Sequence, residues 1–195
     1  DIQLYNMHNV YFTACRFIVS NTIKEFVTIK STSSVVFQHC IIQGSESRNS
    51  MKVKTTKGLF EIEKAQNVTV QKTSIQNTSK LVFLFRNVKS LSIITCIFLR
   101  CMEGAITLTV GNIISNHRFN IMVIKTSFVK CISHYDGAAL SIRSYCNRNH
   151  LKFGIIFIQN SWFQECSSER NGGTVFISLH SHRYASCIPT SLSIF

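Results

Sequence analysis

The chain has 195 residues, of which 45% are hydrophobic and 15% charged, and its formal net charge is +12 at pH 7. The apolar fraction excludes an intrinsically disordered chain, and the length is sufficient for one domain with a substantial core. No run of about 18 apolar residues occurs, so we expect no transmembrane segment in this chain. The excess of basic residues favours anionic partners.

One pattern recurs six times along the chain, and its clearest copy runs from Ser90 to Cys101. Each copy has a small residue at its centre, with apolar residues five and three positions before it and two positions after it. The central residues are Cys15, Cys40, Thr73, Cys96, Thr126 and Ser161. Apolar residues alternate with a period of two on both sides of the centre, but the phase of the alternation changes there. Each copy therefore predicts two short strands that meet at a corner.

A third strand is predicted before each copy, where an apolar pair such as Ile2/Leu4 or Phe83/Phe85 occurs. Three strands and three turns per repeat indicate an all-β solenoid of three-sided coils, the parallel β-helix. An antiparallel sandwich would need hairpin turns between neighbouring strands, and Asn171-Gly172 is the only Asn-Gly pair. We expect one domain over residues 1–195, starting and ending in mid-coil as a fragment of a longer solenoid.

Three copies end in Phe-x-x-Cys and are followed by a segment that contains glycine. These pairs are Phe98–Cys101 with Gly104–Ile106, Phe128–Cys131 with Gly137–Leu140, and Phe163–Cys166 with Gly172–Val175. They resemble the Phe-x-x-Asn and Gly-Gly-Ala-Ile motifs of polymorphic outer-membrane-protein-type surface repeats, with Cys in place of Asn. Those repeats belong to the pectin-lyase-like superfamily. The resemblance implies a right-handed parallel β-helix, here of about six coils, in an extracellular or cell-surface protein that is often an adhesin.

Two columns of cysteines follow from the alignment of the copies. One column holds Cys15 and Cys40, and the other holds Cys101, Cys131 and Cys166. Stacked Cβ atoms lie about 4.8 Å apart, which is wider than a relaxed disulfide. Two interpretations stay open: a ladder of buried thiols that pack as small hydrophobic groups, or one disulfide per column in an extracellular protein. Cys146 and Cys187 lie outside the columns and form a separate candidate disulfide.

The sequence offers few residues for catalysis or metal binding. Asp136 is the only aspartate after Asp1, Glu61 and Glu63 point outward from one strand, and His180 and His182 stand in a polar segment. Glycoside hydrolysis needs paired carboxylates, and calcium needs several oxygen ligands. We therefore expect no metal, no cofactor and no catalytic residue. A polysaccharide lyase or hydrolase of the pectin-lyase-like fold, with its site degenerate or outside this segment, is the alternative, and a structural spacer is another.

The repeat is interrupted at one corner of its last three coils, by insertions at 109–119, 143–154 and 178–190. Stacking places insertions of this kind side by side on one face, where solenoids often bind. The basic residues that we select as candidate ligand-binding residues are Arg118, Arg143, Arg148, His150, His180, His182 and Arg183. The same insertions are also consistent with tolerated surface loops.

These features together predict an extracellular or cell-surface module for adhesion or ligand binding. Its partner would be an anionic polysaccharide or a cell-surface protein. Nucleic acid is disfavoured, because the aromatic residues fall in core columns and do not alternate with the basic ones. The sequons at Asn67 and Asn77 are candidate glycosylation sites and agree with secretion.

Overall fold

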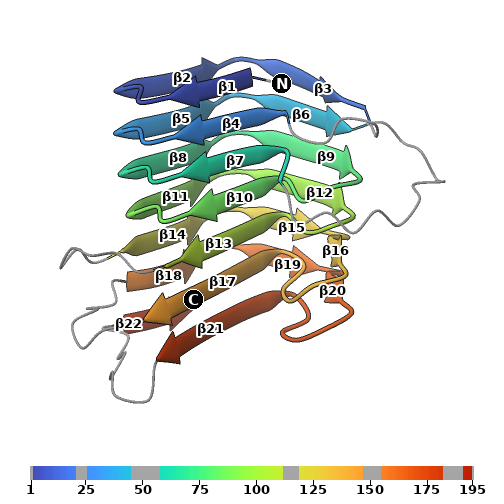
Figure 1. Ribbon diagram of the computed structural model, residues 1–195. Coiled ribbons are helices and arrows are strands. Elements are labelled where there is room, and N and C mark those ends of the chain that lie inside the picture. The colour runs from blue at the N-terminus through green and yellow to red at the C-terminus, as the bar shows by residue number, and fades with distance from the viewer. Residues whose placement is uncertain are drawn as a thin grey trace.

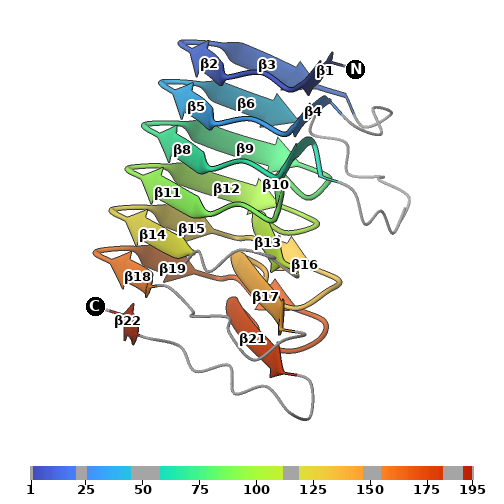
Figure 2. The same ribbon diagram turned by 60° about the vertical axis from the view of Figure 1, so that its left-hand side comes forward.

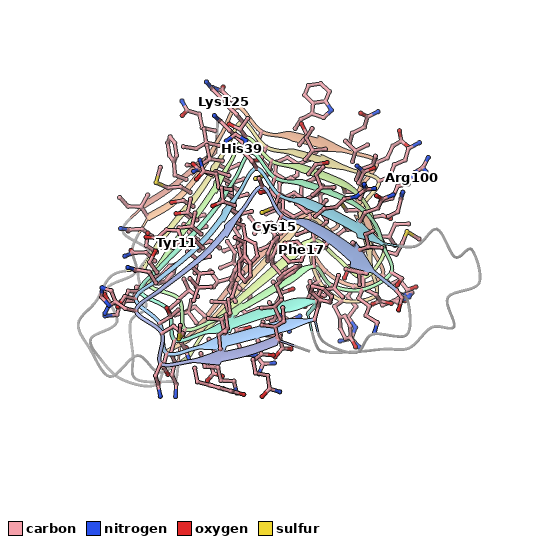
Figure 3. The ribbon with its side chains drawn as sticks, turned by 90° about the horizontal axis from the view of Figure 1, so that it is seen from above. Tyr11, Cys15, Phe17, His39, Arg100 and Lys125 are labelled. Carbon is pink, nitrogen blue, oxygen red and sulfur yellow. The ribbon has the colours of Figure 1, made fainter. Side chains whose placement is uncertain are left out.

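The computed structural model describes residues 2–20, 26–44, 58–111, 119–146, 155–181 and 191–194. Over these residues the chain forms a parallel β-helix, in which three sheets are the walls and successive coils stack along one axis (Figures 1 and 2). Seen from the N-terminal end, the coil is triangular and runs from β1 (Ile2–Tyr5) past Tyr11 and over the apex to Phe17 (Figure 3). It turns clockwise as it recedes, so the helix is right-handed, as expected.

Each wall of the solenoid takes one strand from every coil. Sheet A consists of β1, β4 (Val27–Lys30), β7 (Phe60–Glu63), β10 (Phe83–Arg86), β13 (Ile106–Val110), β17 (Leu140–Cys146) and β21 (Val175–Ser181). Sheet B consists of β2 (Asn9–Thr13), β5 (Ser34–Gln38), β8 (Asn67–Gln71), β11 (Ser90–Ile94), β14 (Asn120–Ile124), β18 (Ile155–Gln159) and β22 (Ser191–Ile194). Sheet C consists of β3 (Arg16–Val19), β6 (Ile41–Gly44), β9 (Ser74–Thr78), β12 (Ile97–Cys101), β15 (Ser127–Val129) and β19 (Trp162–Gln164). The short strands β16 (Ile132–Ser133) and β20 (Ser167–Ser168) pair with each other.

The register of the sheets confirms the columns predicted from the repeat. Phe98 pairs with Ile75 on one side and with Phe128 on the other, and all three are fully buried. The ring centroids of Phe98 and Phe128 lie 4.8 Å apart, with an angle of 10° between the ring planes. The interior is thus filled by like residues stacked at the strand spacing, which is why the same residue type recurs in the same column.

The corner between sheets B and C explains the change of phase in the repeat. One residue per coil has a positive φ of 47° to 55° there, and the six residues are Ala14, His39, Lys72, Thr95, Lys125 and Asn160. A left-handed residue turns the chain sharply, so the strands on either side present different parities to the interior. The predicted bend is confirmed.

The small residue after each corner has a hydrogen-bonding role that its size alone did not suggest. Cys96 Sγ donates to the carbonyl oxygen of Val70 in the preceding coil (3.3 Å), and Thr126 Oγ1 donates to that of Ile93 (3.5 Å). Thr126 Oγ1 also accepts from the backbone N–H of Cys96 (3.4 Å). Cys, Thr and Ser therefore interchange in this column because each is small and each donates a hydrogen bond.

The six cysteines whose side chains the structure describes are free thiols. Cys40, Cys96, Cys101 and Cys131 are buried in the core. Burial raises the pKa of Cys96 to about 11, so this thiol is protonated at neutral pH. The two predicted columns are thus ladders of thiols in this structure. The candidate pair Cys146 and Cys187 is not tested, because the side chain of Cys146 and the whole of Cys187 lie outside the described part.

The three late insertions begin later than predicted. Sheet A continues to Val110 in β13, to Cys146 in β17 and to Ser181 in β21. The longer strands pair with one another, with Arg143 opposite both Thr109 and Ser178, so the backbone groups of these residues are satisfied within the sheet. The prediction that Arg143 and His180 lie in loops was wrong, because both are strand residues. Residues 112–118, 147–154 and 182–190 lie outside the described part.

Candidate ligand-binding site on the outer face of sheet A

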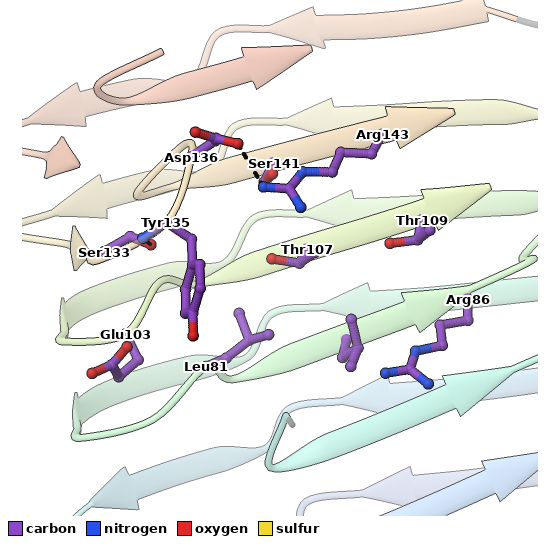
Figure 4. Close-up of a pocket in the computed structure, with 11 residues that line it drawn as sticks. Leu81, Arg86, Glu103, Thr107, Thr109, Ser133, Tyr135, Asp136, Ser141 and Arg143 are labelled. Carbon is purple, nitrogen blue, oxygen red and sulfur yellow. Dashed lines mark hydrogen bonds and ion pairs between the residues drawn. The ribbon is translucent and has the colours of Figure 1, made fainter. Parts of the chain in front are cut away.

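A hollow of about 180 Å³ opens on the outer face of sheet A, over β10, β13 and β17. Its floor consists of outward side chains of these strands, and its wall comes from the turns that precede β10, β13 and β17. The lining residues are Leu81, Leu84, Arg86, Glu103, Thr107, Thr109, Ser133, Tyr135, Asp136, Ser141 and Arg143. Figure 4 shows Glu103 at one end and Arg86 at the other, with Leu81 between them and with Thr107 and Thr109 on the neighbouring strand β13.

The hollow exists because small outward residues alternate with large ones along the columns of sheet A. In one column, Thr107 and Ser141 lie between Leu84 and Phe176. In the neighbouring column, Thr109 lies between Arg86 and Arg143. Since paired strands lie about 4.8 Å apart, the two guanidinium-bearing strands are roughly 10 Å apart and frame the smaller threonines.

Arg143 is held in place by several contacts. Its Nη2 lies 2.6 Å from Asp136 Oδ2, and its Cζ lies 5.7 Å from the ring centroid of Phe176. Asp136 Oδ1 accepts hydrogen bonds from the backbone N–H (3.0 Å) and the side-chain amide (3.2 Å) of Asn171. Burial alone would raise the pKa of Asp136, but the Asn171 N–H and the Arg143 guanidinium outweigh it and hold the pKa below its ordinary value. The guanidinium is therefore preorganised by an ionised carboxylate.

The turn that presents Asp136 depends on the glycine after it. Gly137 has a φ of 67°, and a Cβ built on it would lie 2.5 Å from the carbonyl oxygen of Leu140. A larger residue would therefore clash with backbone, and only glycine adopts this conformation without strain. Gly137, one of the glycines predicted to lead into the next strand, thus also positions the side chain of Asp136.

Arg86 differs from Arg143 because none of the described residues forms a hydrogen bond or ion pair with its guanidinium. It is exposed at the end of β10, and its neighbour in the column, Glu63, pairs instead with Lys30 at 3.6 Å. With Arg143 neutralised by Asp136, the positive charge of this end of the hollow comes from Arg86. An anionic group entering here would be the natural counterion.

The opposite end of the hollow contains a buried carboxyl group. The side chain of Glu103 is 9% exposed, and its Oε1 lies 3.5 Å from Nε2 of His134. On the other side of the imidazole, Nδ1 lies 2.6 Å from Oε1 of Glu169. Burial raises the pKa of Glu103; His134 opposes this shift and Glu169 adds to it.

Two buried polar atoms of the lining have no hydrogen-bond partner among the described residues: Oε2 of Glu103 and Oγ of Ser141. An unpaired buried polar group costs about 1–3 kcal/mol, so native chains rarely keep one without a reason. A polar ligand that displaces the side chains shielding these two atoms would supply the missing partners.

The structure brings only Arg143, of the predicted ligand-binding residues, into this hollow. His180 is on β21, but its side chain is not described, and Arg118, Arg148, His150, His182 and Arg183 lie outside the described residues. The basic loop face is therefore still a prediction. Asn67 is exposed at the start of β8, and Asn77 is half-buried with a φ of 55°.

Arg86, Glu103 and Tyr135 were not predicted from the sequence, and Asp136 was not predicted because it is a lone aspartate and not one of a cluster. A signal was present in the columns: reading the outward positions of sheet A coil by coil shows the small residues between large ones. Among the described residues, no group of three His, Cys, Asp or Glu side chains is arranged to hold a metal ion. No helix long and apolar enough to cross a membrane occurs in the described part of the chain.

Comparisons with known proteins leave the family open. No protein-family model matches the chain, and no curated protein and no solved structure is significantly similar to it. The stacked parallel sheets establish the β-helix architecture.

Proposed function

We propose that the chain is a non-catalytic binding module, extracellular or on a cell surface, whose hollow on sheet A takes one unit of an anionic glycan. The observation that carries the proposal is the lining: a preorganised Arg143, together with an Arg86 guanidinium and oxygens of Glu103 and Ser141 that have no partner among the described residues. The volume of about 180 Å³ is below the roughly 300–1,000 Å³ of a site for a drug-sized ligand, so it suits a single group of a longer polymer.

The charge and hydroxyl content of the lining supports an acidic sugar. Hydroxyls of Thr107, Thr109 and Ser133 donate and accept hydrogen bonds, as sugar hydroxyls require. Tyr135 offers an apolar ring with a polar tip, which suits a ligand that is polar at its edge and apolar on its face. The net charge of +12 favours the approach of a polyanion to the whole surface.

The proposal is tested by isothermal titration calorimetry with a hexuronate tetrasaccharide and a neutral hexose tetrasaccharide of the same linkage. Arg86→Gln should weaken binding of the acidic probe by roughly 10- to 100-fold, the equivalent of one lost charged hydrogen bond. Lys125→Gln is the matched control, because Lys125 lies at the corner between sheets B and C, away from sheet A (Figure 3). Equal losses in both variants, or equal binding of both probes, would show that the attraction is unspecific.

A second candidate function, polysaccharide hydrolysis, is favoured by one observation. Glu103 and Asp136 line the same hollow, and their pKa values are shifted in opposite directions, as in pairs of a general acid and a base. Both oxygens of Asp136 are engaged by Arg143 and Asn171, which favours the binding role. Release of reducing ends from the same tetrasaccharides, abolished by Glu103→Gln without loss of binding, would establish the hydrolase instead.

A further inference from the structure

Glu103, His134 and Glu169 form a row of titratable side chains across three successive coils, beside the hollow. His134 follows β16 and Glu169 follows β20, and these two strands pair in register, so the coil spacing itself places the two side chains next to each other. Glu103 belongs to the turn after β12 in the coil before. We call these three residues the carboxyl–imidazole row.

The geometry lets Glu103 and His134 share one proton. Nδ1 of His134 lies 2.6 Å from Oε1 of Glu169, and Nε2 on the other side of the ring faces Oε1 of Glu103 at 3.5 Å. One proton between these two atoms gives either a carboxylate beside an imidazolium or a carboxylic acid beside a neutral imidazole. Loss of that proton leaves two carboxylates and a neutral ring, so the charge of the row changes by one unit.

Resting on the proposed function of the hollow, we infer that the carboxyl–imidazole row makes binding of an anionic ligand depend on pH, with protonation of the row strengthening it. Glu103 is the member of the row that lines the hollow, and its Oε2 is free of partners among the described residues. With the shared proton present, Glu103 and His134 together carry no net charge; without it, the Glu103 carboxylate repels the ligand's negative charge.

The other charged groups around the row hold their charge over the same range. The segments packed around it carry Lys80, Arg86, Tyr135, Asp136, Arg143 and Arg170. Lysine and arginine side chains are cationic and tyrosine is neutral between about pH 5 and pH 8. The pKa of Asp136 is lowered by its partners, so it is ionised throughout. The row is thus the titrating element of this end of the hollow.

Burial supports the direction of the effect. The desolvated position of Glu103 favours its neutral form and raises its pKa. The exposed fraction of the side chain is 9% for Glu103, 16% for His134 and 57% for Glu169, so Glu103 is the most desolvated member of the row.

The test is titration calorimetry of the hexuronate tetrasaccharide from about pH 5.5 to about pH 8, the interval in which histidine changes charge. The dissociation constant of the wild-type chain should rise about tenfold across this interval, the scale of one added repulsion between like charges. Glu103→Gln, which keeps the shape and stays neutral, should bind with little dependence on pH. Glu63→Gln, a change of an outward carboxylate on β7, is the matched control and should behave as wild type.

Binding that is flat with pH in the wild-type chain, or equally steep in Glu103→Gln, overturns the inference and leaves the proposed function standing. Absence of binding at every pH overturns both. A second measurement needs no ligand: in an NMR titration of the His134 ring, Glu103→Gln should move the titration curve to lower pH, because the ring loses an anionic neighbour. A curve that does not move overturns the shared proton, and with it the inference.

Discussion

Replacement of Asp136 by alanine tests whether the hollow is held together by one carboxylate. Asp136 accepts from Arg143 at 2.6 Å and twice from Asn171, and its side chain is 11% exposed against 30% for Arg143. Because the released partners can reach solvent, the cost is that of lost charge-assisted hydrogen bonds, about 2–3 kcal/mol in total. A domain of this length then loses about 4–12 °C of melting temperature.

The effect of Asp136→Ala should depend on pH with a defined sign. The pKa of Asp136 is lower in the folded chain than the ordinary value of about 3.9 in the unfolded chain. Its contribution to the free energy of unfolding is therefore complete above about pH 4 and is lost as the pH falls through the folded-state pKa. The difference between wild type and variant, measured by circular dichroism melts, should be full at neutral pH and shrink in strong acid.

Amide hydrogen exchange should show which strands are destabilised by Asp136→Ala. Coils of a solenoid contact only their neighbours, so Asp136→Ala should speed exchange in β16, β17 and β21 and leave β4 and β7 unchanged. Glu63→Ala is the control, because Glu63 forms exposed ion pairs with Lys30 and Lys64 that contribute little. A melting temperature of Asp136→Ala within about 1 °C of the control, with unchanged exchange in β17, would refute the role given to this carboxylate.

Three further predictions concern the scaffold. Phe98→Ala removes a fully buried ring stacked on Phe128 and should lower the free energy of unfolding by about 3–5 kcal/mol in urea titrations. Thr95→Asn should raise the melting temperature by about 1–4 °C, because a β-branched residue at φ 55° is strained and asparagine tolerates this conformation. The native thiol of Cys96 should react with Ellman's reagent at pH 8 only after unfolding, since its pKa is raised to about 11 by burial; fast reaction of Cys96 in the folded chain would contradict its burial.

The fold was predictable because the inward residues of successive coils are of the same type, so the core of a solenoid appears in the sequence as a repeated pattern. The pair Phe98 and Phe128 could be placed in one column from spacing alone, and the register confirms it. The corner was predictable from the phase of the alternation, but its left-handed residues were not, since Ala14, Thr95 and Lys125 share no side-chain property. Their backbone conformation is imposed by the strands on both sides, which tertiary pairing fixes more strongly than local preference does.

The site was less predictable, because its residues come from positions with no repeat constraint. Glu103 and His134 lie in turns, 31 positions apart, and only the pairing of successive coils brings them within 3.5 Å. Asp136 could be seen in the sequence as a lone aspartate. Its pairing with Arg143 could not, because only the fold brings the two side chains together. Arg143 itself was selected for its charge, but its expected place in a loop was wrong, because the strand β17 continues past it.

The position of the hollow within the solenoid follows from how such folds distribute their energy. Each coil is stabilised by its own core and its two neighbours, so the cost of unpaired polar groups at Glu103 and Ser141 is confined to the coils that carry them. The same coils have fully buried interior residues, Phe98, Phe128 and Leu140, that offset this cost locally. Outward columns are free to vary from coil to coil, whereas inward columns must match. A binding site on a β-helix is therefore expected where the outward columns vary most in size and charge while the inward columns stay regular, and β10, β13 and β17 meet both conditions.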